Sequence, residues 1–401
     1  MILLPDGPAI NGSLWQFVER GLSPVGAPGQ RREGLGEQQC RVWCLLGRKA
    51  GDNTQVRALA QALGRGFEEK WISARSWELL VHAGARPTLA GINRSRSSAL
   101  EPPWPDIVIT AGRRNEPVAR WIRQQSGARS RLVHVGRPWA PLENWDLIIT
   151  TPQYFLPAAP NILHNRLPLH SPLNAAEVPS LELWRERFAA LPRPWIAVLI
   201  GGDSGRFVLT REKGLRLGAL ANQLAQAAGG ALLVSDSPRT PRAAWQGFTE
   251  CLTMPNYLYR CAEGGDNPYR AILALADAFI VTGESMSMLA EAADTGRPLY
   301  IFDPGDGAAP WWRRAHNYRY KPLSYRFAMR FGPARMRRDV GRIQTALMEA
   351  GEASWLDAQS AAGAGAALGE LSVGAQVATA RDAQAELAKS AEAVRRLLEP
   401  R

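Results

Sequence analysis

The sequence predicts an α/β protein of two Rossmann-like, doubly wound domains that face a cleft. Short apolar runs alternate with helix-like stretches, and this alternation occurs twice along the 401 residues. The apolar runs have the length and composition of buried strands. Many of them end in a loop rich in Gly, Pro, Ser or Thr, and open parallel sheets bind ligands beyond such strand ends.

The first domain is expected at residues 39–165, after an irregular segment at 1–38 that is rich in Gly, Pro and Arg. We expect that early segment to be partly disordered, with a short helix at 13–20. The strands of the first domain are predicted at 41–46, 70–72, 106–110, 132–135 and 147–149. Its helices are predicted at 54–63 and 116–125.

The second domain is expected at residues 181–310, after a proline-containing linker at 166–180. Its strands are predicted at 195–200, 231–234, 257–259, 278–281 and 299–302. Its helices are predicted at 181–191, 215–228, 268–276 and 286–294. The last strand, helix and strand form the βαβ unit of a parallel sheet.

The chain changes character twice after residue 310. Aromatic and basic side chains are interleaved in the segment 311–349, which contains no acid before Asp339. This mixture suits nucleic acid or an anionic membrane interface, and it also suits a helix that packs back on the domains with its aromatics inward and its arginines outward. Residues 350–401 are an Ala/Gly-rich tail. We expect a flexible linker through 374 and a helix near 380–398.

Composition sets the broad class. The hydrophobic content of 46% and charged content of 21% are those of a globular protein. No apolar run approaches the ~20 residues of a spanning helix, and the N-terminus does not resemble a signal peptide. We therefore expect the protein to be cytoplasmic. Peripheral association with the inner face of a membrane is the alternative location. The net charge of +11 is compatible with an anionic partner (a nucleotide, a phospholipid surface or nucleic acid), and its Arg excess is equally compatible with genome composition, so the charge alone does not decide between them.

No metal site is predicted. The spacing of the four cysteines is not that of a zinc site, and no His pair lies near them. They are Cys40, Cys44, Cys251 and Cys261.

Three loops of the second domain carry the residue types that bind phosphate. Adjacent glycines let backbone amides approach a phosphate, hydroxyls can donate to it, and an Arg can clamp it. None of the loops is a P-loop or a GxGxxG fingerprint. The candidates are Gly201, Gly202 and Ser204 in the first loop, Ser235, Arg239 and Thr240 in the second, and Gly283, Ser285 and Ser287 in the third.

Ser287 and Glu291 are four residues apart and share one face of the helix predicted at 286–294. A hydroxyl near a helix N-terminus can bind phosphate, and a carboxylate one turn later can accept hydrogen bonds from a ribose diol. The alternative is that Ser285 caps the helix and that Glu291 is a solvated surface residue.

The first domain offers residues for the acceptor or phosphate side. They follow predicted strands and are Lys49, Gly51, Arg113 and Arg114. Asp52 is a candidate general base, although a carboxylate at the start of a helix is also a common cap. His134 and His164 are further candidates, and a lone His on an apolar strand is commonly a packed residue.

Several segments together resemble the family of the plant "elongated mitochondria" fission factor and its bacterial relatives. They are GRKAGDNTQ at 47–55, PDIVITAGRR at 105–114, GGDSGRF at 201–207, SDSPRTP at 235–241, DNPY at 266–269 and VTGESMSMLAEAADTGRPLYIF at 281–302. The resemblance covers about residues 40–310. It departs at Glu284, because the family usually has Asp-Ser where this chain has Glu284-Ser285.

The family resembles GT-B glycosyltransferases in layout, and its second domain is similar to the nucleotide-sugar domain of the undecaprenyl-linked N-acetylglucosaminyltransferase of peptidoglycan synthesis. The resemblance implies that Glu291 holds the ribose and that the turn of Ser285, Met286 and Ser287 holds the diphosphate. It also implies that Asn267 and Tyr269 lie near the base. The plant member is known as an adaptor for a dynamin-related protein and not as an enzyme.

The first hypothesis is a GT-B-like glycosyltransferase. It moves a sugar from a nucleotide-diphosphate sugar of the UDP type to an acceptor that is unknown. A lipid-linked acceptor is one alternative. It needs no cofactor or metal besides the donor, because backbone amides, a helix dipole and Arg239 stabilise the leaving diphosphate. Asp52 deprotonates the acceptor. The alternative is a non-catalytic adaptor for a protein or membrane partner. An anionic membrane surface at 311–338 is expected before nucleic acid, whose binding there is a third hypothesis.

Overall fold

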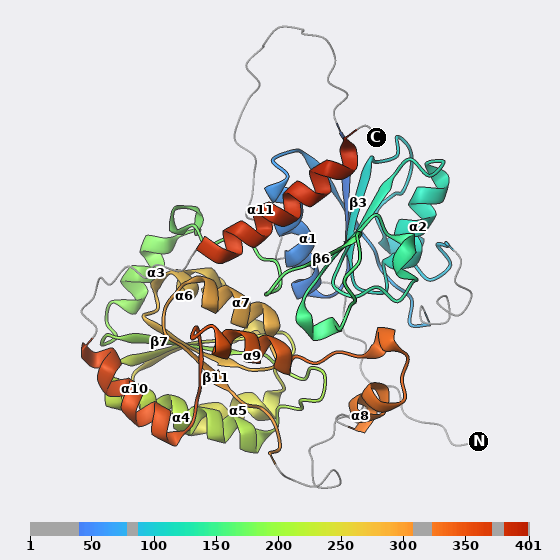
Figure 1. Ribbon diagram of the computed structural model, residues 1–401. Helices are drawn as coiled ribbons and strands as arrows, with labels where there is room; N and C mark the ends of the chain where they lie inside the picture. The colour runs from blue at the N-terminus through green and yellow to red at the C-terminus, as the bar shows by residue number, and fades with distance from the viewer. Residues whose placement is uncertain (1–39, 78–86, 308–322, 371–380, 400–401) are drawn as a thin grey trace, which may run out of the picture. The chain divides into compact units, whose positions relative to one another are not determined.

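The computed structural model describes residues 40–77, 87–307, 323–370 and 381–399. These residues form two parallel six-stranded sheets, each with helices on both faces (Figure 1). This confirms the prediction of two Rossmann-like α/β domains. The short helix expected at 13–20 lies outside the described residues, and the cleft between the domains stays a prediction.

The first sheet has the strand order β2-β1-β3-β4-β5-β6. The strands are β1 (Val42–Leu46), β2 (Phe67–Trp71), β3 (Ile107–Ala111), β4 (Arg131–Val135), β5 (Leu147–Thr150) and β6 (Ile162–His164). Side chains alternate between the two faces, as the two-residue period of a strand requires. Val42 and Cys44 pack on the side of α1 (Ala50–Ala62), whereas Trp43 and Leu45 pack on the side of α2 (Glu116–Gln125).

The second sheet has the strand order β12-β11-β10-β7-β8-β9. The strands are β7 (Trp195–Ile200), β8 (Ala231–Asp236), β9 (Asn256–Tyr259), β10 (Ala278–Thr282), β11 (Leu299–Phe302) and β12 (Ser354–Trp355). Read from β9, this is the 3-2-1-4-5-6 order of the dinucleotide-binding Rossmann fold. Successive strands are added outward from β7 in one direction and from β10 in the other. The point where the strand order reverses, called the switch point, therefore lies between β7 and β10.

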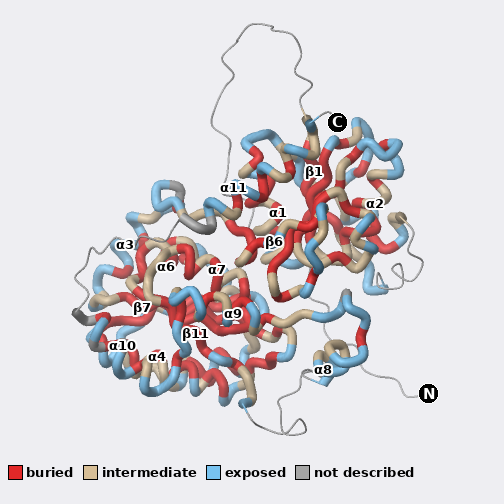
Figure 2. The backbone as a smooth tube through the Cα atoms, in the orientation of Figure 1, coloured by how far each residue is buried: buried red, intermediate tan, exposed pale blue. Residues whose placement is uncertain are grey.

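Two helical layers cover the second sheet, whose central strands are buried on both faces (Figure 2). One layer contains α3 (Leu181–Phe188), α6 (Tyr269–Leu275), α7 (Met286–Asp294) and α9 (Gly341–Glu349). The other contains α4 (Arg211–Ala228), α5 (Arg242–Glu250) and α10 (Ala358–Glu370). Burial on both faces explains why the strands are almost wholly apolar.

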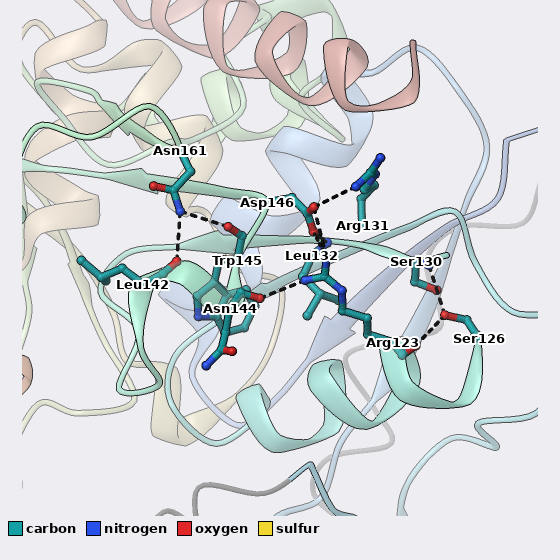
Figure 3. A network of polar contacts seen from close by, with 10 residues as sticks. All are labelled: Arg123, Ser126, Ser130, Arg131, Leu132, Leu142, Asn144, Trp145, Asp146 and Asn161. Carbon is teal, nitrogen blue, oxygen red and sulfur yellow. Dashed lines mark hydrogen bonds and ion pairs between the residues drawn. The ribbon is translucent and has the colours of Figure 1, made fainter. Parts of the chain in front are cut away.

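A polar network fixes the N-terminal ends of β4 and β5, away from the strand ends that could bind a ligand (Figure 3). The Asp146 carboxylate accepts a hydrogen bond from the Leu132 amide at 2.8 Å and pairs with Arg123 and Arg131, each at 3.2 Å. Arg123 also donates to the Asn144 carbonyl at 3.1 Å. The network joins α2 to two strands, so we assign it a structural role.

The flexible linker expected at 350–374 is wrong over 354–370, where β12 and α10 form. Ala is the strongest helix former, and small side chains allow α10 to pack closely on α4. Ala361 and Leu368 are buried in the same core as α4. The domain boundary expected at residue 310 is therefore also wrong, because α9, β12 and α10 complete the second domain. Residues 371–374 lie outside the described part.

The terminal helix is confirmed as α11 (Arg381–Arg395). Its Leu387, Ala391 and Val394 are buried in the core on the α1 side of the first sheet. The last segment of the chain therefore packs on the first domain rather than extending from the second.

Element boundaries and short elements account for the remaining differences, and β2 covers Phe67–Trp71 rather than 70–72. α1 begins at Ala50 rather than at 54, so Asp52 lies in its first turn rather than in a loop. The short strand β6 and the helices α5 and α9 were not predicted, since each is brief and its burial depends on distant contacts.

The segment after residue 310 is described from Leu323, and its tryptophans lie outside the described residues. It contains α8 (Leu323–Arg330). The expectation that its aromatics pack inward is wrong for Phe327 and Phe331, which are 64% and 71% exposed. Within the part of the chain that the structure describes, no helix has the length and apolar content needed to cross a membrane.

Candidate functional site

The candidate site lies at the C-terminal ends of β7 and β10, the switch point of the second sheet. The Gly201 amide donates to Thr282 Oγ1 at 2.8 Å, and the Gly202 amide donates to Glu284 Oε1 at 2.7 Å. We expected these glycine amides to meet a phosphate. Instead they donate to the last residue of β10 and to the loop after it, and they hold that loop in place.

Both glycines are required by close approach of other groups. A Cβ at Gly201 would lie 2.1 Å from Glu284 Oε1, and one at Gly202 would lie 2.1 Å from the Arg239 carbonyl oxygen. Because real Cβ atoms do not come so close, any side chain here would separate the loops. The two glycines therefore let the loops after β7, β8 and β10 converge.

Ser237 and Thr240 bind the loop after β8 to the end of β7. Ser237 Oγ donates to the Gly201 carbonyl at 2.9 Å, and Thr240 Oγ1 donates to the Ile200 carbonyl at 3.1 Å. Arg239 is exposed at the tip of this loop. Ser235, expected in the loop, is instead buried within β8, because that strand continues to Asp236. Ser237 is the serine of the loop.

Glu284 is a buried carboxylic acid at the centre of the site, only 2% exposed. Its Oε1 accepts from Thr282 Oγ1 at 3.0 Å as well as from Gly202. Its Oε2 has no hydrogen-bond partner among the described residues. Burial raises the pKa of Glu284 and outweighs the Arg239 charge and the hydrogen bonds from Thr282 and Gly202, which lower it.

The N-terminus of α7 faces the same loops and is not capped by a side chain. Ser285 occupies the N-cap position, but its hydroxyl makes no capping hydrogen bond in the described structure. The expected capping role is therefore wrong. The first amides of a helix have no intrahelical acceptors, and the helix dipole places positive potential there.

The N-terminus of α1 lies beside that of α7. The N-cap residue of α1, Lys49, also makes no side-chain capping bond within the described chain. A Cβ at Gly51 would lie 3.1 Å from Ser287 Oγ, so the first turns of the two helices adjoin. Two positive helix ends near one hydroxyl favour an anionic ligand.

Glu291 lies one turn beyond Ser287 and is not a solvated residue, so that alternative is wrong. The Tyr269 hydroxyl donates a hydrogen bond to Glu291 Oε2. Burial raises the pKa of Glu291 and, more strongly, that of Tyr269. Tyr269 therefore orients the carboxylate.

His170 adds a second buried pair next to this helix. Its Nε2 lies 3.3 Å from Asp294 Oδ2, and both side chains are buried. Burial lowers the pKa of His170, but Asp294 more than compensates and raises it overall. His170 lies in the predicted linker, and nothing in the sequence singled it out.

The remaining candidates of the second domain have structural contacts. Met286 is buried in the core, and Asn267 is exposed with its Oδ1 accepting from the Tyr269 amide at 3.0 Å. Ser204 exchanges two backbone hydrogen bonds with Phe207 in a tight turn. The Gly283 carbonyl accepts from Gln344 Nε2 at 2.6 Å, and Gln344 comes from α9, which the sequence did not predict.

The first-domain candidates gather at the switch point between β1 and β3. Asp52 Oδ2 lies 3.3 Å from Lys49 Nζ. Gly112 has a φ of +71°, and a Cβ there would lie 2.6 Å from Asp52 Oδ2. Arg113 lies over the Trp139 ring, 4.5 Å from its centroid, and Arg114 is half-buried nearby in sequence.

Glu116 and His134 form a buried pair that the sequence reasoning did not assemble. Glu116 is 1% exposed and accepts from the amides of Trp139 and Ala140, both at 2.8 Å. Burial raises the pKa of Glu116 to about 7. Burial lowers the pKa of His134 to about 3, so the imidazole is neutral and packed against Trp145. His134 is thus no surface base, and His164 binds the Pro157 carbonyl at 3.1 Å.

Among the described residues, no group of three or more His, Cys, Asp or Glu side chains could hold a metal. The four cysteines are free thiols.

Comparison with known proteins identifies a family. Residues 50–321, more than half of the chain, match the model of the family described as "Mitochondrial fission ELM1". The chain is 28% identical over 236 residues to the Arabidopsis thaliana "Mitochondrial fission protein ELM1", covering 53% of this chain and 54% of that protein. It is also 28% identical over 235 residues to "Uncharacterized protein RP120" of Rickettsia prowazekii, covering 50% and 65%. The alignments thus span about half to two thirds of these relatives.

Solved structures with a similar layout are distant. The UDP-GlcNAc 2-epimerase of Methanocaldococcus jannaschii is 9% identical, with a TM-score of 0.48 and coverage of 89% of this chain and 99% of that one. The S. aureus MnaA–UDP co-structure is 8% identical, with a TM-score of 0.47 and coverage of 88% and 91%. A Rickettsia africae glycosyltransferase is 11% identical, with a TM-score of 0.45 and coverage of 91% and 100%. These likenesses assign no activity to this chain.

Proposed function

The chain belongs to the mitochondrial fission ELM1 family, and we propose that its second domain binds a nucleotide-diphosphate sugar of the UDP type. The sugar is transferred to a hydroxyl of an acceptor. If the protein works at a membrane surface, that acceptor is lipid-linked. The observation that carries the proposal is the uncapped N-terminus of α7 at the β7/β10 switch point, beside the N-terminus of α1.

The diphosphate binds at these helix ends in the proposed complex. The first amides of α7 and the Ser287 hydroxyl donate to its oxygens, and Arg239 at the tip of its loop neutralises further charge. When protonated, Glu284 donates from Oε2, the buried oxygen that lacks a partner in the described structure. A charged Glu284 would repel the diphosphate.

The ribose binds Glu291 in the proposed complex. A carboxylate can accept hydrogen bonds from both hydroxyls of a ribose diol. The Tyr269 bond orients Glu291 before the nucleotide arrives, which reduces the entropy lost on binding.

The transfer step uses the first domain. The acceptor oxygen attacks the anomeric carbon of the sugar, its proton passes to Asp52, and the bond from that carbon to the diphosphate breaks with its electron pair leaving on the phosphate oxygen. Lys49 lies 3.3 Å from Asp52 and holds the carboxylate in place.

The second candidate function is a non-catalytic adaptor that retains the fold and binds a protein or membrane partner. The name of the Arabidopsis relative, a mitochondrial fission protein, favours it. The two functions separate experimentally, since an adaptor that keeps the nucleotide site binds UDP without consuming a UDP-sugar.

Isothermal titration of the full chain with UDP tests the proposal. We expect Glu291→Gln to weaken UDP binding about tenfold or more, because a hydrogen bond to a charged acceptor contributes ~1.5–3 kcal/mol. A 2′,3′-dideoxyribose analogue of UDP should bind both proteins alike. Glu250→Gln, a substitution at a half-exposed ion pair on α5, is the matched control. The proposal fails if UDP does not bind, and the ribose assignment fails if Glu291→Gln binds UDP as the wild type does.

A further inference from the structure

We propose that the outward face of α8, together with the turn that follows it, docks on an anionic lipid bilayer. The apolar part of this docking face is Leu323, Phe327 and Phe331, and its basic part is Arg326 and Arg330. The inference does not depend on the nucleotide site, because it rests on a separate element of the chain.

The helical spacing places the three apolar residues on one side. Leu323, Phe327 and Phe331 follow one another at four-residue intervals, so they form one stripe. They are 44%, 64% and 71% exposed, and the two Phe ring centroids lie 5.3 Å apart. In Figure 2 the helix is coloured as exposed and intermediate throughout. Apolar side chains gathered in this way on a surface indicate a binding face.

The opposite side of α8 is less exposed. Tyr325, Ala328 and Met329 are half-buried. Burial raises the pKa of Tyr325, and the Asp339 charge adds to the effect. Apolar side chains therefore lie on both sides of α8, and those of the docking face are the more exposed.

The docking face is basic at its edge. Arg326 and Arg330 are exposed and lie next to the apolar stripe, with the Arg330 guanidinium 5.5 Å from the Phe331 centroid. Exposed Met336 and Arg337 continue the same character. The sequence contains no Asp or Glu between Asp306 and Asp339. Apolar side chains rimmed by arginines, without acids, complement the acyl boundary and the anionic headgroups of a bilayer.

The apolar residues favour a bilayer over nucleic acid. Leu323 and Met336 have no ring on which a base could stack, whereas both gain free energy by entering an acyl layer. Membrane binding through this face needs both its apolar and its basic residues, because neither two arginines nor three apolar side chains alone would hold the protein strongly on a membrane.

Vesicle co-sedimentation of the full chain tests the inference. Phosphatidylcholine vesicles with about one third phosphatidylserine should bind the wild type, and pure phosphatidylcholine vesicles should bind it at least about tenfold more weakly. Arg326→Glu with Arg330→Glu should weaken binding to the anionic vesicles about thirtyfold or more. Phe327→Ser with Phe331→Ser should weaken it about tenfold, since the apolar contribution is lost.

Matched controls separate the docking face from net charge and exposed apolar area. Arg185→Glu with Arg396→Glu makes the same charge change at exposed arginines elsewhere, and Leu183→Ser removes a 44% exposed apolar side chain from α3. Both should sediment as the wild type does. UDP titration and thermal melting of every variant check that the fold is intact and keep this test distinct from that of the nucleotide site.

Three results would overturn the inference. The first is that Arg326→Glu with Arg330→Glu sediments with anionic vesicles as strongly as the wild type. The second is that the wild type binds neither vesicle. The third is that the wild type binds a mixed-sequence oligonucleotide more tightly than the anionic vesicles, which would assign the face to nucleic acid.

Discussion

Glu116 is a buried carboxyl group whose charge the first domain disfavours. The amides of Trp139 and Ala140 stabilise the anion, but burial outweighs them and raises its pKa to about 7. An unfolded chain titrates its Glu side chains near ~4.3. The contribution of Glu116 to stability is therefore fully present below the unfolded pKa and is lost as the pH rises to about 7. His134 acts in the opposite direction, because its lowered pKa costs stability as the pH falls below ~6.5.

The substitution Glu116→Gln isolates the first of these effects. The free energy of unfolding of the wild type, relative to that of the variant, should fall by about 3 kcal/mol between pH 4.3 and pH 7, from ~1.36 kcal/mol per pKa unit. Urea unfolding curves at several pH values measure it, and exposed Glu143→Gln is the control. Parallel stability curves for wild type and variant across this range would show that Glu116 is not a buried titrating group.

At the residue scale, the sequence predicts how residues are spaced along an element better than it predicts which distant side chains they contact. Ser287 and Glu291 lie four residues apart on α7, as expected, whereas the amides of Gly201 and Gly202, expected to meet a phosphate, donate to Thr282 and Glu284 instead. The Tyr269–Glu291 bond and the Glu116–His134 pair could not be predicted, because each depends on which distant residues meet. In the sequence, Glu284 stood out only because the resembled family usually has Asp at this position. Its burial at the centre of the site could not be predicted from that difference.

The helix α10 shows how composition misleads at the element scale. Its Ala and Gly content was interpreted as a flexible linker, yet the same small side chains let it pack on α4. At Gly365 a Cβ would lie 2.3 Å from the Ala227 Cβ, whereas at Gly363 a Cβ would meet nothing within 4 Å. Whether this Ala/Gly-rich segment is flexible or forms a packed helix thus depends on its contact with α4. The sequence of α10 alone does not reveal that contact.

The two glycines of α10 make a matched pair for a stability test. Gly363→Ala should stabilise the second domain by up to about 1 kcal/mol, because Ala replaces Gly in an open helical position. Gly365→Ala should destabilise it by about 1–3 kcal/mol, since the added methyl overpacks the contact with α4. Thermal and urea unfolding of both variants measure the effect. Equal stabilisation by both substitutions would mean that α10 does not pack on α4 in solution.

At the scale of the whole molecule, the chain returns to its first domain at its end. The Glu386 carboxylate of α11 accepts from the Arg166 amide at 2.5 Å, and Asn165 Nδ2 donates to Ser390 Oγ at 2.9 Å. Arg395 Nη2 donates to the Ala62 carbonyl at 2.7 Å. These bonds tie α11 to the segment that follows β6 and to the last residue of α1.

The two α/β repeats could be predicted from the alternation of apolar and helical runs, because each strand lies buried within its own sheet. The strand order, the contribution of β12 to the second sheet and the return of α11 could not. They are set by pairings between segments far apart in sequence, and the local pattern of a segment does not show which distant segment it will pair with.

The central claim is that the β7/β10 switch point is a nucleotide site, and the crystal structure of the protein grown with UDP tests it most directly. The account predicts the diphosphate at the N-terminus of α7 and the ribose hydroxyls within hydrogen-bond distance of Glu291. Well-ordered crystals with this edge of the second sheet empty at saturating UDP, or with UDP bound elsewhere, would contradict it.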